Sequence, residues 1–495
     1  MVSGVLVKAL RQEILACEEG LSLGSEPQLL QRFNVGRSTL RQAVRVLEVE
    51  QLLRVRRGAN GGYFTCRPDE GTVARAAALY LRLRGANLGH QRTVGRVLSA
   101  EVHRMAAEST DQAAREEMRR VLEPLKAARG ASGLREFVAR AETYRKAVAR
   151  LAGNPFLELF FGITYLFGKE VPQIPVFTDR PDRIAQWEDI QWRLNEAVLN
   201  AEPEVGSALA VYRADLMATW LDGETDDAAL DLGAAPSAAR SRATPLAKSS
   251  PMLSGTLAKI LREEILEHQP GWNLGSEAQL LRRFNVGRST LRQAARVLEV
   301  EQLLRVRRGA NGGYFTRRPN ESAVAQVAAL YLSLRNTTAR HQLAAGRMLN
   351  MELHRLAAAS NDQAARDEVR AMLEPLREAS PEVRTRDFIA RTEIYKKAMT
   401  RLADNPLLEL FVGITQLFGG LVTHAPVFGD HPDRVERWEN IQWRLNEAVL
   451  NGEPQVAAAL TAHRYNLMTA WLESETSDDR LDFSLMATAG RASAA

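Results

Sequence analysis

The string FNVGRSTLRQA fills residues 33–43 and recurs unchanged at residues 284–294. Two neighbouring strings repeat in the same way, LGSE at 23–26 and 274–277 and LLRVRRGANGGYFT at 52–65 and 303–316. Every pair is offset by 251 residues, so the two halves align without a gap. Self-similarity of this length indicates a tandem duplication of a whole protein rather than a short structural repeat.

The repeated string predicts two short helices joined by a tight turn. Ser25 precedes an apolar periodic run, which is a helix N-cap signal. Asn34 to Gly36 then form a turn, and a second helix opens at Arg37. Its apolar positions, Leu40, Val44 and Leu47, are spaced by four and three, so Arg37, Ser38, Arg41 and Arg45 fall on the opposite face. This is the helix-turn-helix pattern, whose second helix reads the major groove of DNA.

Two strand-like segments follow, residues 52–56 and 62–65, and the Asn-Gly pair between them predicts a hairpin. A basic hairpin behind a reading helix is a wing. Residues 1–67 hold 10 basic against 6 acidic residues, and residues 252–318 hold 12 against 6, whereas the whole chain carries only +5. The positive charge is therefore concentrated on the two predicted DNA-binding domains, as phosphate binding requires.

The remainder of each copy shows helical periodicity and no strand alternation. We expect a mainly α protein with two tandem copies of a winged helix-turn-helix followed by an all-α bundle. The Ala-, Ser- and Pro-rich connection predicts a flexible linker. The expected divisions are 1–67 and 252–318 for the winged helices, 68–221 and 319–473 for the bundles, 222–251 for the linker and 474–495 for a flexible tail.

The winged-helix segments resemble the DNA-binding domain of the GntR family of bacterial transcription regulators. The resemblance rests on LGSEPQLLQRFNVGRSTLRQAVRVLE followed by LLRVRRGANGGYF. It implies DNA contacts from the reading helix and the wing tip. The implied residues are Arg37, Ser38, Thr39, Arg41, Arg45, Arg57 and Gly58 in the first copy, and Arg288, Ser289, Thr290, Arg292, Arg296, Arg308 and Gly309 in the second. The chain departs from the family at Pro27 and Ala278, where an Arg is common, and in lacking a Gly before the wing.

A winged helix before a helical bundle resembles the FadR branch of that family, whose bundle senses a ligand. Many members bind a metal there through one Asp and three His. The matching positions hold Ala141, Arg145, Gln191 and Arg213 in the first copy and Thr392, Lys396, Gln442 and Arg464 in the second. None of these is a metal ligand of the expected kind, so we predict no metal and no cofactor.

Arg145, Gln191 and Arg213 are predicted to point partly inward, as are their counterparts Lys396, Gln442 and Arg464. Buried cations need partners, which a carboxylate or phosphate effector could supply. The alternative is an internal salt bridge to Glu142, Glu188 or Glu196, or exposure of the charged group to solvent. His90, His103, His341 and His354 lie in polar stretches and are expected at the surface.

The sequence therefore predicts a cytoplasmic, nucleoid-associated transcription regulator, with repression favoured on family grounds. Its partners would be double-stranded DNA with a pseudo-palindromic operator and a small anionic effector, with no membrane. The two copies would pair within one chain as a pseudo-dimer, or between chains as a homodimer. The alternative function is an architectural or looping DNA-binding protein without an effector. An enzyme is not expected, because no nucleophile, metal or cofactor motif is present.

Overall fold

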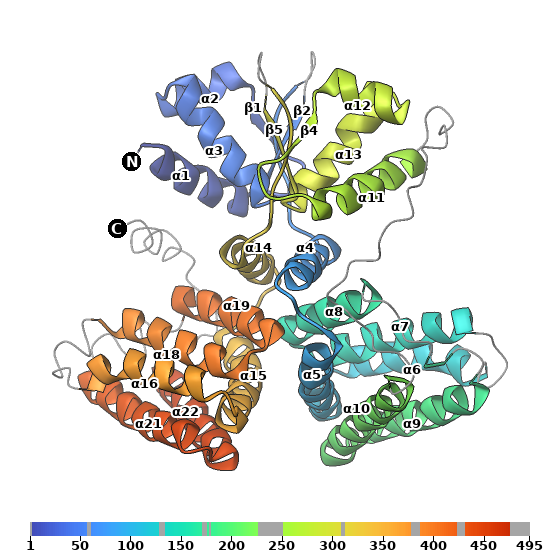
Figure 1. Cartoon of the computed structure of the whole chain (residues 1–495), viewed down its shortest axis with the longest axis vertical. Helices are drawn as coiled ribbons and strands as arrows, with labels where there is room; N and C mark the ends of the chain where they lie inside the picture. Colours follow the sequence, from blue (N-terminus) through green and yellow to red (C-terminus); the bar gives the residue numbers. More distant parts are fainter. Residues whose placement is uncertain are drawn as a thin grey trace. The chain divides into compact units, whose positions relative to one another are not determined.

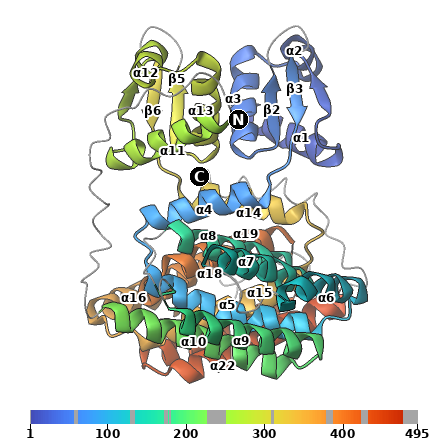
Figure 2. The same cartoon turned by 90° about the vertical axis from the view of Figure 1, so that its right-hand side faces the viewer.

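The computed structural model describes residues 2–56, 61–127, 134–170, 176–177, 180–225, 251–307, 312–377, 387–422 and 431–475. They form two compact units, each built from both copies (Figures 1 and 2). The first unit contains residues 2–83 and 251–334, and the second contains residues 84–225 and 335–475. The predicted linker and tail lie almost wholly outside the described residues. In the described part of the chain, no helix is both long and apolar enough to cross a membrane.

Each copy begins with a small three-stranded winged helix, here called the first head (residues 2–65) and the second head (residues 251–316). The first head comprises α1 Val2–Ala16, β1 Ser22–Gly24, α2 Glu26–Phe33, α3 Arg37–Val49, β2 Leu53–Arg56 and β3 Gly62–Thr65. The second comprises α11 Pro251–Glu267, β4 Asn273–Gly275, α12 Glu277–Phe284, α13 Arg288–Val300, β5 Leu304–Arg307 and β6 Gly313–Thr316. The predicted winged helix-turn-helix is confirmed in both copies.

Local chemistry explains the helix-turn-helix. Ser25 and Gln28 form a capping box at the start of α2, with Ser25 N donating to Gln28 Oε1 at 2.7 Å. Asn34 ends α2 in the left-handed conformation, with φ of 47°. Asparagine tolerates this conformation better than most residues, so the chain reverses there and α3 starts three residues later.

The sheet order is β1-β3-β2, with antiparallel neighbours and Leu53 opposite Thr65. The sequence did not predict β1, because three residues are too few to show an alternation. Its pairing with β3 depends on Gly62, where a Cβ would lie 2.8 Å from the carbonyl oxygen of Gly24. Only glycine permits this close approach of the two strands.

The helix after each head completes the core of the other head. These helices are α4 Glu70–Leu83 and α14 Glu321–Ser333, which pack against each other (Figure 1). Leu79 of α4 is 3 % exposed and belongs to the core of the second head, whereas Leu330 of α14 is 5 % exposed and belongs to the core of the first. Neither head therefore has a complete hydrophobic core of its own.

The second unit contains two all-α bundles, the first bundle (residues 88–225) and the second bundle (residues 339–475). The first comprises α5 Leu88–Glu108, α6 Gln112–Ala127, α7 Leu134–Leu151, α8 Pro155–Glu170, α9 Pro181–Leu199 and α10 Pro203–Thr225. The second comprises α15 Ala339–Ala359, α16 Gln363–Arg377, α18 Phe388–Ala403, α19 Pro406–Val422, α21 Pro432–Leu450 and α22 Pro454–Glu475. In each bundle the first helix packs against most of the others, which explains the burial of its middle.

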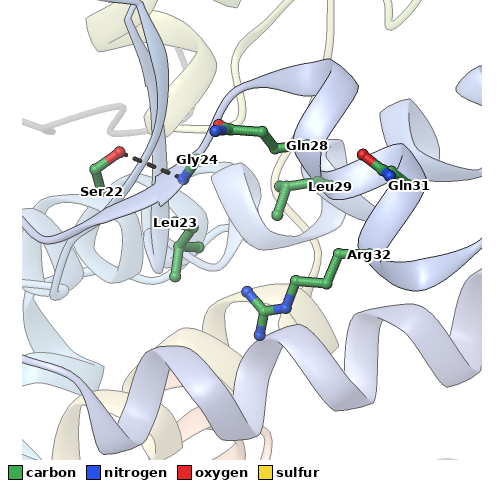
Figure 3. A pocket seen from close by; sticks show the side chains of 7 residues that line it. All are labelled: Ser22, Leu23, Gly24, Gln28, Leu29, Gln31 and Arg32. Atoms are coloured by element: carbon green, nitrogen blue, oxygen red, sulfur yellow. Dashed lines mark hydrogen bonds between the residues drawn. The ribbon is translucent and has the colours of Figure 1, made fainter.

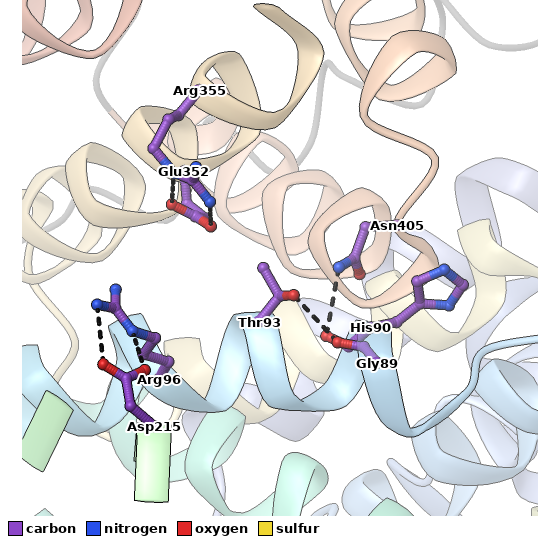
Figure 4. A network of polar contacts seen from close by, with 8 residues as sticks. All are labelled: Gly89, His90, Thr93, Arg96, Asp215, Glu352, Arg355 and Asn405. Carbon is purple, nitrogen blue, oxygen red and sulfur yellow. Dashed lines mark hydrogen bonds and ion pairs between the residues drawn. The ribbon is translucent and has the colours of Figure 1, made fainter. Parts of the chain in front are cut away.

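The two bundles contact each other through reciprocal pairs. Asn154 Nδ2 donates to the carbonyl oxygen of His341 at 3.0 Å, and its counterpart Asn405 donates to that of His90 at 3.3 Å (Figure 4). Ion pairs join Arg335 to Glu158 and Arg84 to Glu409 in the same reciprocal way. A two-fold interface has this self-complementary character, and here both halves belong to one chain.

Candidate functional sites

The exposed face of α3 carries the predicted DNA-reading residues. Leu40 and Leu47 are fully buried in the first head, so the helix cannot rotate without losing its core contacts. This leaves the predicted cations and serine of α3, and their counterparts on α13, exposed: Arg37, Ser38, Arg41, Arg45, Arg288, Ser289, Arg292 and Arg296. The two reading helices contact each other and thus belong to one double head.

The predicted threonine contacts are less accessible. Thr39 is half-buried and Thr290 is 7 % exposed, although the two occupy equivalent positions. The predicted wing-tip residues Arg57, Gly58, Arg308 and Gly309 lie outside the described residues.

One arginine in each reading helix is held by a carboxylate of the preceding helix. Arg41 Nε lies 3.2 Å from Glu26 Oε1, and Arg292 Nη2 lies 3.0 Å from Glu277 Oε1. Both pairs are partly exposed, so they contribute little to stability. They do, however, place an acid beside each of two arginines that are predicted to contact DNA.

The strands leading to the wing add cations that the sequence reasoning passed over. Arg54 and Arg56 are exposed on β2, and Arg56 lies over the Phe64 ring at 4.2 Å. Arg307 repeats this contact with Phe315 at 4.6 Å. These arginines could have been found from the sequence, because LRVR alternates apolar residues with arginine. In a strand with one buried face, such alternation places the arginines on the solvent-exposed face.

A shallow hollow beside the start of α2 offers no enclosed ligand site (Figure 3). Its lining is partly polar and includes Arg32, which pairs with Glu13 at 2.6 Å. The lining residues are Ser22, Leu23, Gly24, Gln28, Leu29, Gln31 and Arg32.

The first bundle buries a cation beside neutral groups. Arg213 of α10 is 8 % exposed and donates to Gln191 Oε1, and also to Ser99 Oγ at 3.1 Å. Its guanidinium lies 5.1 Å from the centroid of the Trp187 ring. Burial lowers the pKa of Arg213, and among the described residues no carboxylate pairs with it. The three proposed carboxylate partners make other contacts, Glu142 with Lys146, Glu188 with Arg140 and Glu196 with Trp192 Nε1.

The second bundle repeats this arrangement. Arg464 of α22 is 7 % exposed, donates to Gln442 Oε1 and lies 4.9 Å from the Trp438 ring centroid. Burial lowers its pKa as well. Its Nε atom is buried without a hydrogen-bond partner. Two of the three predicted effector positions are thus brought together in each copy.

The third predicted effector position, held by Arg145 or Lys396, contacts other residues. Arg145 of α7 stacks on the Tyr165 ring at 4.6 Å, and its counterpart Lys396 pairs with Glu393 of its own helix at 2.8 Å.

The expectation that the helix histidines lie at the surface is wrong for His103 and His354, which are 0 % and 3 % exposed. His103 Nε2 is 2.9 Å from the Tyr144 hydroxyl, and its Nδ1 is 2.6 Å from the carbonyl oxygen of Ser99. Burial, followed by the nearby arginine, lowers the pKa of each histidine to about 3. Both are therefore neutral near pH 7. Sequence reasoning missed them because α5 and α15 are enclosed on several sides and show no simple apolar stripe.

A small cavity of about 50 Å³ lies beside Gln191 in the first bundle. Its lining comes from α6, α7 and α9, and it includes Trp187, whose buried Nε1 has no hydrogen-bond partner. A cluster of three or more His, Cys, Asp or Glu residues able to hold a metal is not found in the described ranges. The chemistry available here is hydrogen bonding and charge.

Two segments of the chain match one known protein family. Residues 3–60 and 253–311 each match the family described as "Bacterial regulatory proteins, gntR family". A solved structure, Streptococcus agalactiae GntR, is similar at 15 % identity with a TM-score of 0.29, over 44 % of this chain and 98 % of that one. No curated protein matches the chain.

Proposed function

The chain carries two DNA-binding domains of the gntR family, and from this premise we propose that it is a sequence-specific transcription regulator with two reading heads per chain. It would bind one pseudo-palindromic operator, repress by occluding it, and work in the cytoplasm bound to the nucleoid. The observation that carries the proposal is the double head. Two basic reading helices, α3 and α13, belong to a single unit made from one chain.

Charge and geometry both support this role. Arg37, Arg41 and Arg45 and their counterparts are exposed on helices whose opposite faces are fixed in a core. Such helices enter the major groove, and paired helices read half-sites separated by about one turn of DNA or a multiple. Because each head needs a leucine from the other copy, the two heads cannot separate without exposing apolar surface.

We further propose a small anionic effector in the bundles. Arg213 and Arg464 are buried cations that hydrogen-bond to neutral side chains. A carboxylate would supply the missing charge and take hydrogen bonds from the guanidinium. Binding would change the free energy of the bundles and thereby the affinity for DNA.

The test is a selection of fragmented genomic DNA on the purified full chain at moderate salt, followed by sequencing. The regulator should enrich one short pseudo-palindrome. The double variant Arg37→Ala with Arg288→Ala should lose the enrichment and reduce the salt dependence of binding by about one unit of slope for each phosphate contact removed. Arg104→Ala with Arg355→Ala removes the same charge from the bundles and should leave both unchanged.

Two other outcomes of this DNA selection would indicate different functions. Paired palindromes at helical spacing would indicate four heads in an assembly of two chains and a looping role. Retention without enrichment over random fragments would contradict the regulator and support an architectural DNA-binding protein.

A further inference from the structure

Comparison of the two bundles assigns the effector site to one of them. We propose that each chain binds one small carboxylate, in the first bundle beside Trp187 and Gln191, and that the side chains of Tyr465, Thr461 and Glu439 close the second bundle to it. This inference rests on the proposed regulator function and names the ligand class, the site and the stoichiometry.

The lining of the first-bundle cavity is almost unchanged in the second copy. Of the residues that form it, only Ala141 differs, with Thr392 as its counterpart. The differences lie one layer deeper, around the buried arginine. Ser99, Ala210 and Ala214 of the first copy correspond to Asn350, Thr461 and Tyr465 of the second. All four changes place the larger side chain in the second bundle.

Tyr465 fills space that is open in the first bundle. A Cβ added at Gly346 would meet the Tyr465 ring at 3.0 Å, whereas a Cβ added at the equivalent Gly95 would meet only Thr164 Cγ2, at 3.7 Å. Tyr465 is 8 % exposed, and its hydroxyl accepts a hydrogen bond from Asn350 Nδ2 at 2.8 Å. Its ring also lies 5.9 Å from the Arg464 guanidinium.

Thr461 changes the partner of the buried histidine. Thr461 Oγ1 is 2.9 Å from His354 Nδ1, so this histidine is held by α22. In the first bundle Ala210 cannot make this contact: His103 Nδ1 lies 2.6 Å from the carbonyl oxygen of Ser99, and its Nε2 lies 2.9 Å from the Tyr144 hydroxyl. Tyr144 lines the cavity, so its hydroxyl position depends on a partner that only the first copy uses.

Tyr395, the counterpart of Tyr144 in the second copy, belongs to a buried ionic cluster. Tyr395 donates to Glu439 Oε2 at 2.8 Å and accepts from Arg391 Nη2 at 3.0 Å. Arg391 and Glu439 form a bidentate pair whose side chains are 4 % and 0 % exposed. The corresponding pair in the first bundle, Arg140 with Glu188, is 14 % and 11 % exposed.

Exposure of the neighbouring side chains follows the same pattern. Trp438 is 6 % exposed and Gln442 is 1 % exposed, but Trp187 and Gln191 are only half-buried. A ligand can therefore reach Gln191 from the cavity, whereas reaching Gln442 requires opening of a packed cluster.

The ligand class follows from charge and size. The Arg140–Glu188 pair balances itself, so Arg213 leaves an uncompensated positive charge behind Gln191. Trp187 lines the cavity, and its buried Nε1 has no hydrogen-bond partner. A carboxylate is a stronger acceptor for the Arg213 guanidinium than the Gln191 amide oxygen. A cavity of about 50 Å³ has room for about four water-sized groups, which fits a short-chain monocarboxylate.

The first experiment measures access without any ligand. Cys17 and Cys66 are replaced by the residues at the equivalent positions of the second copy, giving Cys17→His and Cys66→Arg. Gln191→Cys or Gln442→Cys is then added, and alkylation by iodoacetamide is followed by mass spectrometry. We expect Gln191→Cys to react at least about tenfold faster, because the second position is reached only after local opening. Equal rates would overturn the closure of the second bundle.

The second experiment counts sites with fluoroacetate as the probe, observed by ¹⁹F NMR on the full chain. We expect saturable binding at one equivalent per chain. The variant Ser99→Asn/Ala210→Thr/Ala214→Tyr, which transfers the second copy's residues, should lose this binding. The matched variant Thr461→Ala/Tyr465→Ala should keep it and gain a second equivalent.

Two equivalents in the unmodified chain, or binding retained by the Ser99→Asn/Ala210→Thr/Ala214→Tyr variant, would overturn the single-site proposal. No saturable binding at all would overturn the ligand class. Melting temperatures establish that each variant folds. The genomic DNA selection tests DNA binding by the heads in the absence of ligand. Failure of the proposed regulator function can therefore be distinguished from failure of the proposed ligand site.

Discussion

Phe160 stacks on Phe411, the residue at the same position of the other copy, with ring centroids 4.3 Å apart and planes 10° from parallel. A residue meets its own counterpart only on a two-fold axis of the structure. The reciprocal hydrogen bonds of Asn154 and Asn405 agree with that axis. The duplication has therefore placed both halves of a two-fold arrangement in one chain.

The contact between Phe160 and Phe411 predicts that the protein is a monomer in solution. Because the two-fold contact surface of the bundles is already occupied, we expect a mass near 54.9 kDa by sedimentation at micromolar concentration. Phe160→Ala with Phe411→Ala should lower the free energy of unfolding of the bundle unit by at least about 3 kcal/mol, since both rings are fully buried. A mass of twice the chain in the unmodified protein would contradict pairing within the chain.

The exchanged leucines predict that a change in one copy weakens the head of the other. Leu79→Ala removes buried apolar volume from the second head and should cost about 2–3 kcal/mol. Hydrogen exchange should therefore accelerate at residues 257–316 more than at residues 6–65. Arg82→Ala, at an exposed position of the same helix, serves as the control and should leave both heads unchanged. Faster exchange confined to the first head would refute the exchange of core residues.

The carboxylates beside the reading helices predict a gain in DNA affinity when they are neutralised. Glu26→Gln with Glu277→Gln frees Arg41 and Arg292 and removes two negative charges from the DNA-facing surface. We expect operator binding to tighten by about threefold to tenfold at low salt, and the gain to shrink as salt rises. Glu101→Gln with Glu352→Gln neutralises two bundle acids and provides the charge-matched control. Unchanged or weaker binding by the head variant would show that the two arginines do not face phosphate.

The buried histidines predict a loss of stability in mild acid. Burial lowers the pKa of His103 and of His354 from 6.5 to about 3, so the unfolded chain binds more protons between these values. Stability is therefore fully present above pH 6.5 and falls as the pH drops towards 3. Between pH 7 and about pH 5 each histidine should remove about 2 kcal/mol from the free energy of unfolding.

Chemical denaturation at the two pH values checks this. The double variant His103→Gln with His354→Gln should show a smaller difference than the unmodified chain, and His463→Gln, at an exposed position, should not. An undiminished difference in the double variant would mean that other groups cause the acid sensitivity.

Much of the local structure could be predicted from the chain itself. Ser25 and Asn34 delimit α2, and the spacing of Leu40, Val44 and Leu47 determines which face of α3 is exposed. These signals depend on hydrogen bonds and periodicity within a few residues, so they survive without knowledge of the fold. The wing was predictable for the same reason, whereas the duplication was read directly from identical strings 251 residues apart.

The candidate ligand site was only partly predictable. Helical spacing placed Gln191 and Arg213 inward, and the structure joins them by a hydrogen bond. It also placed Arg145 partly inward, and this half-buried side chain stacks on Tyr165 of another helix and not beside Gln191. His103 was assigned to the surface because its neighbours in sequence are polar. Its burial results from packing by several helices, which no single-helix pattern reports.

The sequence by itself determined the duplication, which shows as identical strings 251 residues apart. It also determined the two winged helices, their basic reading faces and the helical character of the bundles, because these depend on local spacing and charge. Only the tertiary structure decided that Leu79 and Leu330 complete each other's heads, that Phe160 meets Phe411, and that His103 and His354 are buried. Those outcomes depend on which distant surfaces fit together, and shape complementarity between residues far apart in sequence leaves no periodic trace in the chain.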